Sequence, residues 1–250
     1  MRILALANQK GGVGKTTTAV NLATALAATG KRVVLVDFDP QGNASTGFGL
    51  ARDQRSPSSY DLLHAPERTR EALRDTMVPG LRIIPSTDAL AGAEVELVGE
   101  ENAAGRLKKA LEQIDDADII FIDCPPSLSL LTLNGLVAAN GVLIPLQTEF
   151  YALEGLSQLL KTVEQVRARQ NPRLDIAGVV LTMYDRRNNL SELVAADVRA
   201  ALGKKVFETV IPRNVRLSEA PSHGMPALLY DIRCPGSEAY MALAREVAAA

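Results

Sequence analysis

Short, continuous apolar runs alternate along this chain with longer segments of helical pattern, and this alternation restricts the fold more than any other feature of the sequence. Runs in which every residue is apolar are typical of strands that are covered on both faces of a sheet. The alternation predicts one α/β domain, residues 1–250, with a mainly parallel twisted sheet and helices on both faces. The predicted strands are residues 3–7, 32–37, 81–85, 118–122, 142–145, 176–181 and 206–211, and the predicted helices are residues 16–29, 89–98, 103–114, 129–139, 152–170, 190–202 and 237–247.

Residues 51–79 are the least regular part of the sequence and are rich in Arg, Ser, Pro and Asp. They show no sustained hydrophobic period of either a strand or a helix. We therefore expect this stretch to be a surface excursion of the domain rather than a linker.

The composition argues against several classes of protein. The formal net charge is −2, so binding of nucleic acid would need a local basic patch. Cys124 and Cys234 are far apart and form no CxxC pair, which argues against a disulfide scaffold and a zinc site. The most apolar stretch, residues 128–146, contains two Asn-Gly pairs and is interpreted as a helix followed by a buried strand, not a membrane span. The sequence thus predicts a soluble protein with reduced thiols.

The segment KGGVGKTT, residues 10–17, lies between the first predicted strand and the first predicted helix, as a phosphate-binding loop does. Its glycines let backbone N–H groups turn toward one point, and the helix directs its positive end there. Lys15 is expected to reach the β- and γ-phosphates, Thr16 to offer its hydroxyl to Mg²⁺, and Thr17 to bond a phosphate oxygen. The alternative is a glycine-rich turn with an incidental GKT. The predicted nucleotide-binding residues of this loop are Gly11, Gly12, Val13, Gly14, Lys15, Thr16 and Thr17.

This loop departs from the usual phosphate-loop pattern, G-x-x-x-x-G-K-[ST]. Counting back from Gly14, the first glycine should stand at position 9, which is Gln9, and a second lysine, Lys10, follows it. Taken alone, Lys10 is interpreted as a solvated surface lysine.

Two further segments place acids at the carboxyl ends of predicted strands, the edge at which parallel α/β sheets bind ligands. The run DADIIFIDCPPS contains Asp123, which we expect to hold Mg²⁺ through water; a helix cap or turn is the alternative. The run VVLVDFDPQGN contains Asp37 and Asp39, and residues two apart on a strand point to the same side. One of this pair could support the metal or the loop while the other positions the attacking water. Both could instead cap the following helix.

Taken in order, KGGVGKTT, DFDPQGN and DCPPS closely resemble the motifs of the ParA/MinD family of deviant Walker A ATPases, and the resemblance runs through the whole chain. The segment IPRNVRLSEAPSHG resembles the chromosomal ParA (Soj) branch more than MinD. The resemblance implies a P-loop NTPase fold and the cofactors ATP and Mg²⁺. It also implies that Pro212 and Asn214, in IPRN, hold adenine.

The resemblance also implies roles for residues in the three motifs. Lys10 corresponds to the signature lysine, which crosses a dimer interface to the partner's phosphates, and Lys15 to the phosphate-loop lysine. Asp39 corresponds to the acid that orients the hydrolytic water, and Asp123 to the Walker B acid. Lys10, Lys15 and Asp39 are thus the expected catalytic residues. A second cation from the other subunit would act as an arginine finger does, and ATP would stabilise the homodimer.

ParA proteins bind double-stranded DNA without sequence preference as ATP-bound dimers, and the resemblance carries this property to Arg187 and Arg216. Each could neutralise a DNA phosphate, which predicts strongly salt-dependent binding. Arg186, Lys204 and Lys205 would belong to the same basic cluster, which nearby acids dilute. No aromatic residues interleave with the cluster, so base stacking is not expected.

The resemblance implies a chromosome- or plasmid-partitioning ATPase with weak basal turnover, in which a ParB-type partner stimulates hydrolysis and so releases DNA. We expect a cytoplasmic, nucleoid-associated protein that binds no membrane and has no DNA-binding extension before its first strand. A MinD-like membrane switch is one alternative and would need a basic amphipathic C-terminal helix, which AYMALAREVAAA lacks. An iron–sulfur carrier would need cysteines in CxxC or at a dimer axis, and a metabolic P-loop enzyme would need a second substrate site.

Overall fold

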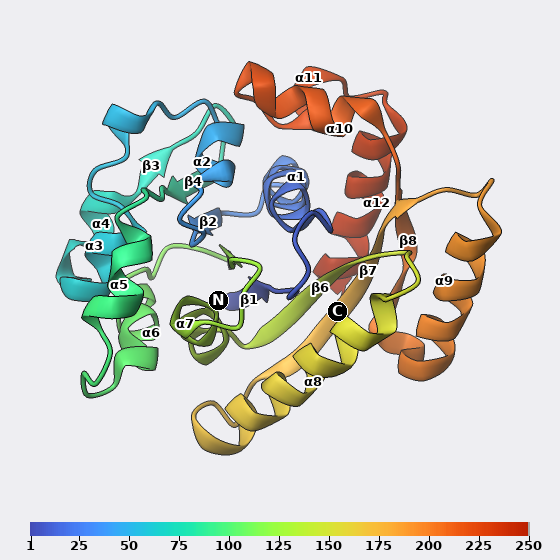
Figure 1. Cartoon of the computed structure of the whole chain (residues 1–250). Coiled ribbons are helices and arrows are strands. Elements are labelled where there is room, and N and C mark those ends of the chain that lie inside the picture. The colour runs from blue at the N-terminus through green and yellow to red at the C-terminus, as the bar shows by residue number, and fades with distance from the viewer. Residues whose placement is uncertain (250) are drawn as a thin grey trace.

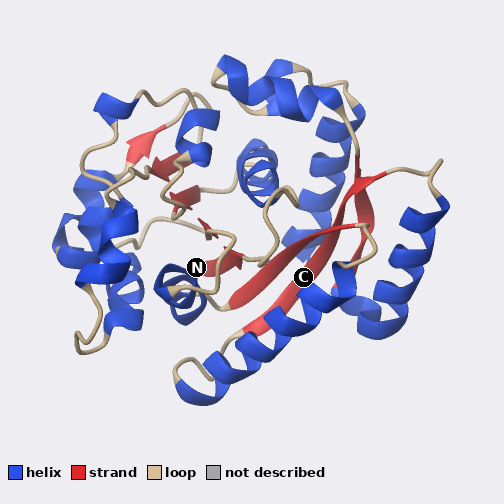
Figure 2. Cartoon of the chain, viewed as in Figure 1, coloured by secondary structure: helices blue, strands red, loops and turns tan. Residues whose placement is uncertain are grey.

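The computed structural model describes residues 1–249 and contains an eight-stranded sheet in the order β3-β4-β2-β5-β1-β6-β7-β8 (Figures 1 and 2). Neighbouring strands run parallel except β3 and β4, which are antiparallel. The mainly parallel sheet expected from the sequence is confirmed. The strands are β1 (Arg2–Leu6), β2 (Val33–Asp37), β3 (Arg74–Asp75), β4 (Leu81–Ile84), β5 (Ile119–Asp123), β6 (Gly141–Gln147), β7 (Asp175–Tyr184) and β8 (Val206–Pro212).

The helices within the described residues include all seven that the sequence predicts and five short ones that it does not. The short helices α2, α3, α4, α10 and α11 have four to six residues each, too few to show a helical period. The helices are α1 (Lys15–Ala28), α2 (Asn43–Gly47), α3 (Ser59–His64), α4 (Thr69–Ala72), α5 (Leu90–Glu96), α6 (Arg106–Leu111), α7 (Leu130–Ala138), α8 (Ala152–Arg169), α9 (Asn189–Leu202), α10 (Val215–Glu219), α11 (Ala227–Tyr230) and α12 (Pro235–Ala249).

Side chains that alternate along the central strands supply two apolar cores, one on each face of the sheet. Leu4 and Leu6 of β1 pack with α1 and α12, whereas Ala5 of the same strand packs with α7 and α8. Figure 1 shows α1 and α12 on one side of the sheet and α7 and α8 on the other. Because both faces are covered, the inner positions of β1, β2, β5 and β6 are apolar, which explains the nearly continuous apolar runs in the sequence.

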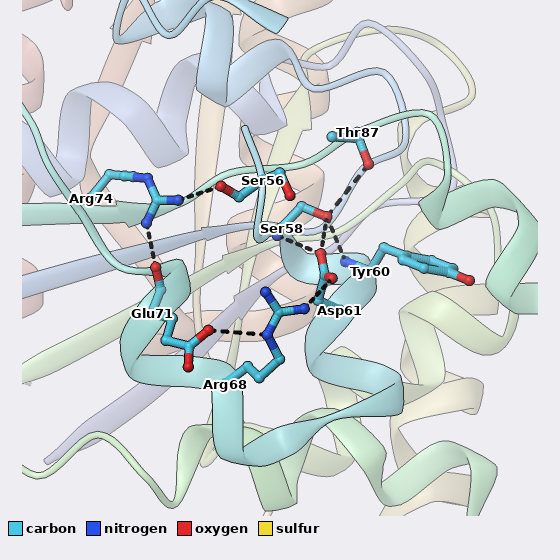
Figure 3. Close-up of polar contacts among 8 residues, drawn as sticks. All are labelled: Ser56, Ser58, Tyr60, Asp61, Arg68, Glu71, Arg74 and Thr87. Atoms are coloured by element: carbon cyan, nitrogen blue, oxygen red, sulfur yellow. Dashed lines mark hydrogen bonds and ion pairs between the residues drawn. The ribbon is translucent and has the colours of Figure 1, made fainter. Parts of the chain in front are cut away.

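The prediction of a surface excursion at residues 51–79 was wrong in part. This segment contains α3, α4 and β3, and Leu62 and Leu63 are fully buried. Its polar side chains bond to one another: Arg68 donates from Nη1 to Asp61 and from Nε to Glu71, each at 3.0 Å (Figure 3). The segment is therefore a packed part of the domain.

Among residues 1–249, no helix is both long enough and apolar enough to span a membrane. The most apolar stretch, residues 128–146, contributes α7 and most of β6, as predicted. Ala250, the last residue of the AREVAAA segment, lies outside the described residues.

Candidate functional site

The phosphate loop joins β1 to α1 and is anchored to two neighbouring strands. Gly12 and Gly14 have φ values of 75° and 84°, in the left-handed region that favours glycine, and Gly14 is the N-cap of α1. Asn8 donates from Nδ2 to Pro145 O of β6 at 2.7 Å and accepts from Lys10 N at 3.0 Å. Thr182 of β7 donates to Val13 O at 2.8 Å. Asn8 and Thr182 hold the loop, and no motif in the sequence identified them.

Lys15 lies inside the loop rather than on its surface. Its exposed fraction is 7%, and Nζ donates to Lys10 O at 3.3 Å, so the side chain folds back over the loop. Burial lowers the pKa of Lys15, and the carboxylates of Asp123 and Asp39 oppose that shift. The structure therefore brings Lys15 close to Asp123 and Asp39, two of the three acids that the sequence nominated.

Asp123 is the last residue of β5 and is fully buried. Neither carboxylate oxygen has a hydrogen-bond partner among the described residues. Burial raises the pKa of Asp123 to about 8; the charge of Asp37 adds to the rise, and the Thr16 hydroxyl and Lys15 counteract it. The cap and turn alternatives for Asp123 would need hydrogen bonds that its carboxylate does not make.

The donors at this point suit Mg²⁺. The ion prefers oxygen ligands and keeps several waters, so a carboxylate and a hydroxyl beside the phosphates are a sufficient contribution from the protein. Asp123 and Thr16 supply those two groups. In residues 1–249, no group of three or more His, Cys, Asp and Glu side chains is arranged to hold a metal ion.

Asp37 and Asp39 differ in environment, contrary to the prediction that both face the nucleotide from one strand. β2 ends at Asp37, which pairs in register with Asp123, and Asp39 lies in the turn that follows. Asp37 is fully buried, and its Oδ2 accepts from Ser45 N at 2.7 Å and Ser45 Oγ at 2.6 Å, which ties it to α2. Burial raises the pKa of Asp37 to about 6. Asp37 therefore anchors α2 to the end of β2 and makes no hydrogen bond to the phosphate loop among the described residues.

Asp39 does not cap α2, because the N-cap of that helix is Gly42. Its Oδ1 accepts from Gln41 N at 2.9 Å, within the turn. Its exposed fraction is 8%, and its negative charge acts to raise the pKa of Lys15. Asp39 is thus the acid of this pair whose backbone lies outside the sheet and whose position depends on a turn.

Lys10 lies at the rim of the site and forms an ion pair with Glu149 of its own chain, in the segment between β6 and α8. Both side chains are nearly half exposed, at 46% and 42%. A solvated pair of this kind contributes little free energy. No pattern in the sequence pointed to Glu149.

Pro212 and Asn214 lie beside the phosphate loop although they are about 200 residues away in the sequence. They line a cavity of about 340 Å³ together with Gly14, Thr17 and Thr182. Asn214 is also the N-cap of α10, accepting from Arg216 N at 3.0 Å. Expected phosphate and adenine residues thus share one cavity.

The expected DNA-binding arginines are exposed but paired with acids. Arg187 donates to both carboxylate oxygens of Asp185, from Nε at 3.0 Å and Nη2 at 2.9 Å, and this contact lowers the pKa of Asp185 to about 2. Arg216 donates from Nη1 to Glu219 at 2.8 Å. Both arginines follow the carboxyl ends of their strands, β7 and β8.

Lys204 and Lys205 do not belong to the same patch as these arginines, contrary to the sequence-based expectation. They lie in the 3₁₀ turn Gly203–Lys205, immediately before β8, so the length of that seven-residue strand, about 20 Å, separates them from Arg216. Lys205 donates to Asp175 at 2.7 Å, and Asp175 is the first residue of β7, at the amino end of the strand whose carboxyl end precedes Arg187.

Comparisons with known proteins agree with these motifs. The model of a family described as an AAA domain matches residues 1–176. The chain is 58% identical over 250 residues to the chromosome partitioning protein ParA of Caulobacter vibrioides, covering 99% of this chain and 94% of that one. It is 54% identical over 249 residues to the sporulation initiation inhibitor protein Soj of Bacillus subtilis, covering 99% and 98%. A crystal structure of cobyrinic acid a,c-diamide synthase from Mycobacterium smegmatis with bound ADP and magnesium superposes with a TM-score of 0.85, at 38% identity and over 98% and 93% of the two chains.

The sequence match extends over nearly the full length of both curated relatives, and the three motifs meet at one edge of a P-loop sheet. The chain belongs to the ParA/Soj family of deviant Walker A ATPases.

Proposed function

We propose that this protein is an ATP-dependent DNA-partitioning ATPase for a chromosome or a plasmid. The observation that carries the proposal is the meeting of Lys15, Asp39 and Asp123 at the phosphate loop. These residues supply a cation for phosphate, an acid for the attacking water and an acid for the metal. The relatives named as chromosome-partitioning proteins support the choice of cargo class.

ATP is expected to occupy the phosphate loop and the adjoining cavity, with adenine between Pro212 and Asn214. The backbone N–H groups of the loop and the N-terminus of α1 suit the phosphates. Thr16 and Asp123 would hold Mg²⁺, which when bound neutralises charge on the β- and γ-phosphates. Asp39, in the turn that follows β2, orients water for hydrolysis.

Lys10 is expected to act on the second nucleotide of an ATP-bound homodimer. To do so it must leave Glu149, and the small free energy of an exposed pair permits that exchange. A cation that reaches the partner's phosphates binds more strongly to the charge that develops in the transition state than to ATP itself. Because each nucleotide is then held by two chains, ATP favours the dimer and the dimer favours ATP.

DNA binding is expected from Arg187 and Arg216 on the dimer. Because Asp185 and Glu219 offset these arginines within one chain, a single subunit is a weak DNA ligand. Two subunits double the number of DNA phosphates that the protein neutralises, so DNA affinity becomes dependent on ATP. A ParB-type activator would stimulate hydrolysis and return the nucleoid-bound dimer to the cytoplasm.

The membrane-switch alternative would need an apolar helix face that is free to enter a lipid surface. The last helix, α12, instead buries Tyr240, Leu243 and Val247 against the sheet and α1. No observation favours that alternative.

Sedimentation with non-specific double-stranded DNA tests the proposal. We expect the wild-type protein to pellet with DNA in ATP and not in ADP, and to be released as salt rises. The double variant Arg187→Ala/Arg216→Ala should bind more weakly and with a smaller salt dependence. The slope of log K against log salt should fall by about 0.9 for each DNA phosphate that the variant no longer neutralises.

Arg70→Ala is the matched control, because Arg70 is an exposed arginine paired with Asp115 on another part of the surface. It should sediment as the wild type does. Equal binding in ATP and ADP would contradict the nucleotide switch, and full affinity of the double variant would show that the DNA patch lies elsewhere.

A further inference from the structure

A buried arginine lies beside the turn that carries Asp39, and the three motifs leave it without a role. Arg55 follows the 3₁₀ turn Arg52–Gln54 and is 6% exposed. A guanidinium carries five N–H donors, and its burial is unfavourable unless those donors are satisfied. Arg55 should therefore bond extensively to its surroundings.

All five N–H groups of Arg55 are used, and most of them bind the segment from Gly42 to Leu50. Nε and Nη2 donate to Leu50 O at 3.1 and 2.8 Å. Nη1 donates to Gly42 O at 3.2 Å, and Nη2 also donates to Thr46 Oγ1 at 2.9 Å. The fifth bond runs from Nη1 to Ser86 O at 3.5 Å, just after β4. The guanidinium thus holds α2 and its flanking turns against the sheet.

The guanidinium approaches the backbone closely at Gly42, which joins Arg55 to Asp39. Gly42 has a φ of 63°, and a Cβ at this position would overlap Arg55 Nη1. Gly42 N donates to Asp39 O at 2.9 Å, while Gly42 O accepts from Arg55. The turn is fixed from its other side by Asp37, which accepts from Ser45. Arg55 and Asp37 together determine where the backbone of Asp39 lies.

Arg55 is itself held by the packed segment that the sequence presented as an excursion. Arg74 Nη2 donates to Ser56 O at 2.6 Å, immediately after Arg55, and Ser58 N donates to Asp61 Oδ2 at 2.7 Å (Figure 3). Asp61 is bonded in turn to Arg68. These hydrogen bonds among residues 56–74 therefore hold the chain segment that follows Arg55, and Arg55 in turn holds the turn that carries Asp39.

We propose that Arg55 is a positioning residue for ATP hydrolysis: it fixes the Gly42 carbonyl and thereby the direction of the Asp39 carboxylate. The inference rests on the hydrolytic role proposed for Asp39. Within the described residues Arg55 makes no hydrogen bond to the phosphate loop, residues 10–17. Its loss therefore moves the turn and leaves the phosphate ligands in place.

Arg55→Met, compared with Arg52→Met, tests this role. Arg52 is exposed, and its side chain makes no bond within residues 1–249, so it is the matched control. For Arg55→Met we expect kcat for ATP to fall by about ten- to a hundredfold with KM changed by less than about twofold. Amide hydrogen exchange in the nucleotide-free protein should rise in residues 40–50 and stay unchanged in residues 10–17. Arg55→Lys, which keeps the charge but loses the planar fork, should give an intermediate kcat.

Two results would overturn the proposal. If Arg55→Met lowers the melting temperature but keeps the wild-type kcat well below that temperature, Arg55 serves stability alone. If KM rises with the loss of kcat and residues 10–17 exchange faster, Arg55 acts on the whole site. Should Arg55→Met not fold, Arg55→Gln and Arg55→Lys are judged by the same readouts. A wild-type chain without ATP hydrolysis would contradict the proposed function, and the exchange comparison would still decide whether Arg55 holds residues 40–50.

Discussion

Lys15→Ala is expected to lose ATP affinity by about a hundredfold or more. Lys15 is 7% exposed and lies beside Asp123 and Asp39. Its removal takes away the cation that attracts the phosphates of ATP and leaves two carboxylates that repel them. Truncating one partner of a buried charge pair between binding partners costs about 2–5 kcal/mol of binding free energy, and about 1.4 kcal/mol corresponds to a factor of ten in affinity. Binding of a fluorescent ATP analogue measures the loss directly.

Lys31→Ala is the control, because Lys31 is an exposed lysine just beyond the other end of α1. It should bind ATP as the wild type does. If Lys15→Ala retained wild-type affinity, the phosphate site would have to lie outside the loop at residues 10–17.

Asp123→Asn is expected to stabilise the nucleotide-free protein while it weakens the effect of Mg²⁺ on ATP binding. The folded-state pKa of Asp123 is raised to about 8, above the ordinary value of about 3.9. The folded protein therefore binds more protons than the unfolded chain between these values, so stability falls as pH rises from about 4 to about 8. The substitution removes this loss, and its gain in unfolding free energy should be about 2 kcal/mol larger at pH 8 than at pH 6.

Melting temperatures at the two pH values, without nucleotide or Mg²⁺, check this prediction. A difference of about 2 kcal/mol corresponds to about 4–8 °C in a chain of this size. Asp118→Asn is the control: the pKa of Asp118 is lowered to about 2 by Arg32, so its carboxylate stays charged across this range. A gain for Asp123→Asn that is the same at both pH values would contradict the role of the buried charge.

The sheet was predictable from the sequence because its cause is local. Strands covered on both faces form nearly continuous apolar runs, and each of the seven predicted runs forms a strand. The phosphate loop was predictable for the same reason, since Gly12, Gly14 and Lys15 must lie within a few residues of one another to form one phosphate-binding loop. Asp123 followed from its place at the end of β5.

The rest of the site depends on contacts between distant segments, which no sequence period reveals. Asn8 bonds Pro145, Thr182 bonds the phosphate loop, and Glu149 pairs with Lys10. The different environments of Asp37 and Asp39 were missed because the strand ends between them, which the alternation rule could not indicate. Arg55 was missed because a buried arginine looks in the sequence like any surface arginine.

The same limit explains the basic residues. Lys204 and Lys205 were grouped with Arg216 because they are close in the sequence. Strand β8 lies between them, however, so the lysines precede its amino end and Arg216 follows its carboxyl end. Groups at opposite ends of one strand cannot form one patch, however close their numbers are.

The measurement that tests the two-subunit ATP switch most directly is the fate of ATP bound to Asp39→Ala. The variant, the wild type and Asp53→Ala, which replaces an exposed acid, are each mixed with radiolabelled ATP, Mg²⁺ and DNA, and the nucleotide in the DNA pellet is identified over time. We expect Asp39→Ala to remain on DNA as a dimer with its ATP intact, hydrolysing at least about a hundredfold more slowly than the wild type and Asp53→Ala. Hydrolysis of ATP by Asp39→Ala at the wild-type rate would contradict the assignment of the water-orienting acid. Release of that variant from DNA while its ATP is intact would contradict the switch itself.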